Sequence, residues 1–146
     1  YYANNANNYS RQILKIQSKV KKKFEFTEPN KRYLVTSEGA FSYLAKDLDM
    51  KEAYLWPMNA DQQGTPQQIR KVIDIVLKNN IPVIFSESTV SDKPAKQVAS
   101  ETNAVYGGIL FVDSLSGKDG LVPSYLDLLE VTTDRILNGF KKATGE

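Results

Sequence analysis

Three acidic residues stand directly after stretches of sequence that have the composition of buried strands. In chain order these acids are Glu38, Glu87 and Asp113. Ligands of parallel α/β sheets bind outside the carboxyl ends of the strands, so we expect the three acids to share one rim. Carboxylates that crowd together repel one another unless a cation lies among them. Oxygen ligands favour hard divalent ions such as Mn²⁺ or Mg²⁺, although each acid taken alone could simply cap the next helix.

The sequence excludes several other kinds of site. It contains no His and no Cys, which removes the usual nucleophilic triad, thiolate metal sites and disulfides. Gly107-Gly108 precedes a predicted strand instead of following one, so it is not a phosphate-binding loop. A pair of carboxylates could perform glycosidase chemistry, which keeps an acidic-cleft hydrolase as an alternative.

The composition is that of an ordinary globular domain. Hydrophobic residues make up 41% and charged residues 25% of the 146 residues, and the net charge is +2. This weak charge argues against a dedicated nucleic-acid binder. No apolar run approaches the roughly 20 residues that span a membrane. The first residue is Tyr1 and not Met, so we expect a start that is processed, truncated or engineered.

The elements that would position the acids alternate along the chain. Apolar residues recur every three or four positions from Tyr2 to Phe24, which predicts a helix of roughly 35 Å. Four predicted strands follow, at residues 32–36, 53–56, 82–86 and 109–112. The predicted helices between and after them cover residues 39–46, a segment opening at Thr65-Pro66, residues 92–102 and a segment opening near Pro123. This alternation predicts one α/β lobe with a four-stranded parallel sheet flanked by helices.

Five short motifs together resemble a known protein family. They are Val35–Phe41 (VTSEGAF), Tyr54–Trp56 (YLW), Gln63–Pro66 (QGTP), Phe85–Ser88 (FSES) and Phe111–Ser114 (FVDS). In this order they resemble the C-terminal lobe of the metal-specific solute-binding proteins of bacterial ABC transporters, the manganese, zinc and iron receptor group. The chain is most similar to the periplasmic receptors of Gram-negative manganese or zinc uptake systems.

The resemblance implies which acids would bind the metal. Members of this family hold the ion between two lobes, with two His from the N-terminal lobe and a Glu or His plus an Asp from the C-terminal lobe. The matching positions here are Glu38 and Asp113, and Glu at the first position resembles the manganese and iron branch. Glu87 matches a recurring acid whose expected role is to support the site, not to bind the ion. Further supporting residues are expected to be Ser37, Ser114 and Trp56, the last as a cleft wall or core residue.

The resemblance also implies a domain organisation. Residues 1–28 would be the long helix between the lobes, and residues 29–146 would be the C-terminal metal-binding lobe, with the N-terminal lobe absent. The expected function is capture of Mn²⁺ or Zn²⁺ in the periplasm for an ABC permease, without enzymatic activity and with weak or no metal binding by this lobe alone. The alternative is a protein-interaction or adhesin module of the same receptor type. The surface that the missing lobe would cover predicts a homodimer.

Overall fold

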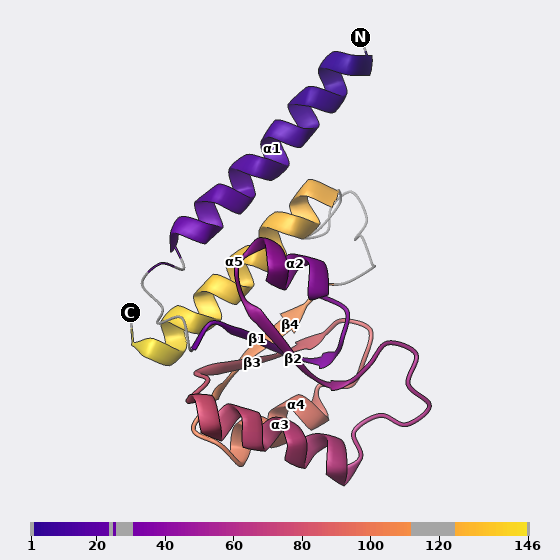
Figure 1. Ribbon diagram of the computed structural model, residues 1–146, viewed down its shortest axis with the longest axis vertical. Coiled ribbons are helices and arrows are strands. Elements are labelled where there is room, and N and C mark those ends of the chain that lie inside the picture. Colours follow the sequence, from indigo (N-terminus) through magenta and orange to yellow (C-terminus); the bar gives the residue numbers. More distant parts are fainter. Residues whose placement is uncertain (1, 24, 26–30, 112–124, 146) are drawn as a thin grey trace.

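A computed structural model describes residues 2–23, 25, 31–111 and 125–145, and it has an α/β fold with parallel strands (Figure 1). The helices are α1 Tyr2–Lys23, α2 Ser42–Asp47, α3 Pro66–Asn79, α4 Lys93–Ser100 and α5 Tyr125–Thr144. The strands are β1 Tyr33–Glu38, β2 Lys51–Trp56, β3 Val83–Glu87 and β4 Val105–Leu110. The predicted alternation of strands and helices is confirmed.

The four strands form two parallel pairs where one continuous sheet was expected. β1 pairs with β2 and β3 pairs with β4, while β1 and β3 lie side by side in the middle. At the carboxyl end of this central boundary, the Glu38 N–H donates to the side chain of Glu87 and not to a backbone carbonyl of β3. A side chain therefore takes the place of a ladder hydrogen bond where the two pairs meet.

Strand β4 begins four residues before the predicted strand. Its pairing with β3 slips by one residue, because Ile84 lies opposite Tyr106 and Phe85 lies opposite Gly108. Gly107 is the extra residue, and a Cβ there would clash with Cε1 of Phe85. The sequence predicted both glycines to precede the strand, whereas they lie within it, and the bulge at Gly107 leaves room for the Phe85 ring.

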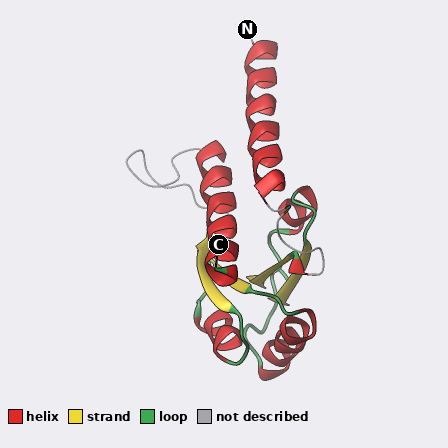
Figure 2. Ribbon diagram, turned by 90° about the vertical axis from the view of Figure 1, so that its left-hand side faces the viewer, coloured by secondary structure: helices red, strands yellow, loops and turns green. Residues whose placement is uncertain are grey.

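Helices cover both faces of the strands, as the sequence predicts. Alternate residues of β1 point to opposite faces, so that Leu34 packs in the core beneath α2 and α5. Its neighbour Val35 packs in a second core, which includes residues of α3 and α4. Figure 2 shows α5 and the paired helices α3 and α4 on opposite sides of the strands.

Helix α1 extends away from the rest of the molecule (Figures 1 and 2). Its residues 3–12 are exposed, whereas Ile13 and Ile16 are partly buried against the core that contains α5. A long first helix is thus confirmed, and its length exceeds what the lobe can cover. Within the described residues, no helix combines the length and the apolar character needed to cross a membrane.

Candidate metal centre

Glu38 and Glu87 meet at the adjoining carboxyl ends of β1 and β3. Each is the last residue of its strand, and the Glu38 N–H donates a hydrogen bond of 3.1 Å to Oε1 of Glu87. The prediction that these two acids share one rim is therefore confirmed. Asp113 and Ser114 lie outside the described residues, so the placement of the third acid stays a prediction.

The backbone of Glu38 is held by hydrogen bonds on both of its polar groups. Its N–H is bound by Glu87, and its carbonyl oxygen accepts from the Thr36 hydroxyl at 3.0 Å and from the Ala40 N–H at 2.8 Å. The next residue, Gly39, donates its N–H to the Trp56 carbonyl at 3.0 Å, which continues the pairing with β2. The half-buried Glu38 side chain thus projects from a backbone with little freedom to move.

Glu87 is almost completely buried, with 1% of its surface exposed. Burial raises the pKa of this carboxyl from its ordinary 4.5 to about 7, because removal from water disfavours the charged form. The hydrogen bond from the Glu38 backbone opposes this rise, and the charge of the Glu38 carboxylate adds to it. Near neutral pH, Glu87 therefore carries only part of a negative charge beside Glu38.

Unpaired buried polar atoms gather at the same strand ends. Of the four buried side-chain atoms without a hydrogen-bond partner among the described residues, Ser37 Oγ, Trp56 Nε1 and Glu87 Oε2 belong to these strand ends, and Glu52 Oε1 belongs to the start of β2. Such groups are rare in folded proteins and mark places where a ligand, water or another segment completes the bonding. By contrast, the Ser86 hydroxyl is satisfied by the Tyr106 hydroxyl at 2.6 Å.

The two remaining described candidates, Ser37 and Trp56, lie within the protein interior. Ser37 is completely buried, and Trp56 is 1% exposed in the core formed with α3 and α4. Trp56 is also the strand partner of Glu38 in the pairing of β1 with β2. Trp56 is thus a core residue at the end of β2. Its expected role in supporting a metal site stays a prediction.

The described residues do not contain a complete metal site. No group of three His, Cys, Asp or Glu residues within them is arranged to hold an ion. Glu38 offers a hard oxygen ligand suited to divalent ions such as Mn²⁺ or Zn²⁺, but one carboxylate binds such ions weakly. A functional site at this rim would need further ligands, for which Asp113 is the candidate within this chain.

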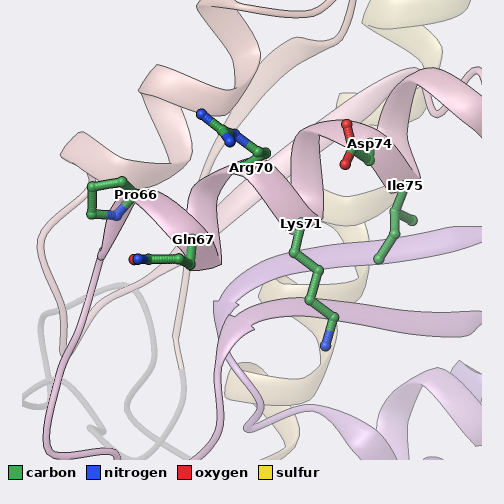
Figure 3. A pocket seen from close by; sticks show the side chains of 6 residues that line it. All are labelled: Pro66, Gln67, Arg70, Lys71, Asp74 and Ile75. Atoms are coloured by element: carbon green, nitrogen blue, oxygen red, sulfur yellow. The ribbon is translucent and has the colours of Figure 1, made fainter.

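A surface hollow lies along α3, away from the rim at Glu38 (Figure 3). It has a volume of about 560 Å³ and is lined by Pro66, Gln67, Arg70, Lys71, Asp74 and Ile75. All six residues come from one helix, and Asp74 is the only carboxylate among them. This hollow offers no convergent set of metal ligands and is separate from the rim at Glu38.

The sequence analysis missed the part that Thr36 plays in the site. The hydroxyl of Thr36 binds the carbonyl of Glu38, two residues further along the same strand. Residues two apart share one face of a strand, so Thr36 also lies on the face of the Glu38 side chain. The sequence Thr-Ser-Glu at the end of a predicted strand could have indicated this, because it places a hydroxyl two residues before the acid.

The chain is similar to known proteins of metal binding and metal uptake. The chain matches the family described as zinc-uptake complex component A, periplasmic (ZnuA), over residues 1–139. It is 57% identical over 139 residues to the iron-binding protein YfeA of Yersinia pestis, covering 95% of this chain and 45% of that protein. It is 34% identical over 144 residues to the manganese ABC transporter substrate-binding lipoprotein PsaA of Streptococcus pneumoniae, covering 97% of this chain and 46% of that protein.

Solved structures share the fold. The Mn-bound periplasmic metal-binding protein from Candidatus Liberibacter asiaticus has a TM-score of 0.84 and 47% sequence identity, covering 94% of this chain and 50% of that one. The periplasmic zinc-binding protein TroA of Treponema pallidum, with 20% identity and a TM-score of 0.77, covers 91% of this chain and 50% of that one and shares the fold alone. The chain spans about half the length of the curated relatives it matches.

Proposed function

Because this chain belongs to the ZnuA family of periplasmic zinc-uptake components, we propose that it forms the C-terminal part of a receptor that captures a divalent metal ion in the periplasm and delivers it to an ABC permease. The observation that carries the proposal is the family match over residues 1–139, which includes Glu38 at the carboxyl end of β1. The relatives described above are metal-binding or transporter substrate-binding proteins, not enzymes. The proposed cargo is Mn²⁺ or Zn²⁺.

We propose Glu38 and Asp113 as the two ligands that this chain supplies. The half-buried Glu38 carboxylate lies at the rim where ligands of parallel α/β folds bind, and its backbone is fixed by hydrogen bonds. Asp113 belongs to the FVDS motif, which follows the residues of β4 in the sequence. Two imidazole ligands would come from an N-terminal lobe, in agreement with the half-length match to the relatives.

A receptor of this kind works by enclosing the ion and excluding water. Four side chains that replace the hydration shell of the ion supply most of the binding free energy. A lobe that offers two carboxylates alone should therefore bind Mn²⁺ or Zn²⁺ far more weakly than a complete receptor. Glu38 instead of His at its position favours a harder ion, so we propose Mn²⁺ as the preferred cargo.

Isothermal titration with Mn²⁺ and with Zn²⁺ tests this proposal. The variants are Glu38→Gln and Asp113→Asn, which remove a charged oxygen ligand with almost no change in shape. The control is Asp74→Asn on the outer side of α3. We expect both ligand variants to lower the affinity by at least about tenfold and the control to leave it unchanged. Binding that is insensitive to both ligand substitutions would overturn the assignment.

A further inference from the structure

A buried acid directly contacts the backbone of the proposed ligand Glu38. Oε1 of Glu87 accepts the Glu38 N–H at 3.1 Å, across a sequence separation of 49 residues. We propose that Glu87 is a positioning residue, which does not bind the ion but fixes the direction in which Glu38 presents its carboxylate. This inference rests on the proposed function, because it gives Glu38 the part of a ligand.

The anchor itself is rigid. All five residues of β3, of which Glu87 is the last, are buried. Directly after it, the Ser88 N–H donates to the Leu110 carbonyl at 2.8 Å, which ties the end of β3 to β4. The backbone that carries this carboxylate is thus held in place, and burial leaves its side chain little room to move.

The hydrogen bond between Glu38 and Glu87 lies where no backbone hydrogen bonds join the two strands. β1 and β3 belong to different strand pairs, and no ladder joins them in the described structure. The Glu38 carbonyl is already held by Thr36 and Ala40, which leaves the N–H as the remaining polar group of the Glu38 backbone. Without Glu87, the end of β1 would be attached to the β3–β4 pair by side-chain packing alone.

Precision at this position matters because metal ligands tolerate little displacement. Productive coordination requires each ligand atom within a few tenths of an ångström of its ideal distance. Groups that orient a ligand through hydrogen bonds typically change metal affinity by about 10- to 100-fold when they are removed. A backbone hydrogen bond at the ligand residue itself is well placed to have an effect of this size.

Direct binding of the ion by Glu87 is the competing interpretation. Its Oε1 is engaged by the Glu38 N–H, and its unpaired Oε2 is as buried as the rest of the residue, which is 1% exposed, against a half-buried Glu38. These observations favour positioning over ligation. The two interpretations differ in what an uncharged hydrogen-bond acceptor at position 87 would do, since an amide oxygen accepts the N–H but, without a negative charge, binds a divalent ion more weakly than a carboxylate does.

Two variants of the ¹⁵N-labelled chain, Glu87→Gln and Glu87→Leu, separate these cases. The first readout is the amide resonance of Glu38 without metal, which reports the hydrogen bond. We expect the Glu38 amide proton to move upfield in Glu87→Leu and to stay near its wild-type position in Glu87→Gln. The second readout is the Mn²⁺ concentration that half-broadens the resonances of Glu38 and Gly39, which detects even weak binding. Thr102→Val, which removes hydrogen bonds at the end of α4, controls for a general loss of stability.

We expect Glu87→Leu to require about 10- to 100-fold more Mn²⁺ than wild type, and Glu87→Gln and Thr102→Val to require about as much as wild type. Equal loss in the Gln and Leu variants would overturn positioning in favour of direct ligation. Wild-type binding by all variants would overturn the inference and leave the proposed function intact. Failure of Mn²⁺ to broaden these resonances in the wild-type chain, even at millimolar concentration, would overturn the assignment of Glu38 as a ligand and with it this inference.

Discussion

The backbone N–H of Glu38 is bound by the side-chain carboxylate of Glu87, so the ends of two neighbouring strands are joined through a titratable group. The bond spans the boundary between the β1–β2 pair and the β3–β4 pair. An acid in this position cannot be solvated when the protein is folded, because Glu87 is 1% exposed. The protonation of one residue is thereby coupled to the stability of the fold.

We predict that this acid makes the protein less stable as the pH rises toward neutrality. The folded-state pKa of Glu87 is raised from 4.5 to about 7, so the folded chain holds this proton more tightly than the unfolded chain. The contribution of Glu87 to the free energy of unfolding is therefore fully present below pH 4.5 and is lost as the pH rises through about 7. The difference amounts to roughly 3 kcal/mol. Urea unfolding across this pH range measures it.

The Glu87→Gln variant is the matched control for this pH effect. It keeps the size of the side chain and an oxygen that accepts the Glu38 N–H, but it has no titratable proton. Its stability should decline less than that of the wild type between weakly acidic and weakly basic pH. Parallel curves for the two proteins would show that another group governs the pH dependence.

We predict that Gly139→Ala in α5 destabilises the protein, although Ala is normally the better helix residue. A Cβ at Gly139 would lie 2.7 Å from Cζ of the completely buried Phe85. The expected cost is about 1–3 kcal/mol from overpacking, measured by thermal or urea unfolding. In the background of Phe85→Leu the same change should cost less. Additive effects of the two substitutions would contradict the contact.

We predict that Thr65→Ala destabilises the protein by about 1 kcal/mol through the start of α3. The Thr65 hydroxyl accepts from the Gln68 N–H at 3.2 Å, and the Gln68 side chain accepts from the Thr65 N–H at 3.0 Å. Thr65→Ser keeps the hydroxyl and should retain most of the stability. Circular dichroism during urea unfolding compares the three proteins, and equal midpoints for all of them would exclude this cap as a source of stability.

We predict that the chain self-associates through apolar residues on α1. Tyr9 and Leu14 are 42% and 61% exposed, and exposed apolar surface promotes association. Size-exclusion chromatography with light scattering should show a dimer that is weakened by replacing both residues with Lys. The similarly exposed Met58, changed to Gln, is the control. A strict monomer at high protein concentration would contradict this prediction.

The sequence predicted the order of elements well because apolar periodicity reports burial directly. The helix at Pro66–Asn79 followed from its Thr-Pro start, and three strands were found within one to two residues of their bounds. The fourth strand was misplaced, since Tyr106-Gly107-Gly108 has the composition of a turn. Its strand geometry includes a bulge in which the Phe85 ring fills the space that Gly107 leaves. That contact is tertiary and cannot be read from local composition.

The candidate site could be predicted as a rim but not as a set of bonds. Placing Glu38 and Glu87 after their strands required only the rule for the ends of parallel strands. Their direct hydrogen bond depends on β1 lying beside β3, and the sequence does not reveal which strands are neighbours. The division of the strands into two pairs was missed for the same reason.

The protruding helix α1 would convert a small rotation at its base into a larger displacement of its exposed end. Its exposed residues 3–12 extend for about 15 Å beyond the point where Ile13 and Ile16 contact the core. A rotation of the helix by about 10° about this contact would displace its N-terminal end by about 3 Å. Small changes in how Ile13 and Ile16 pack on the core would therefore move the exposed end of α1 by several times as much.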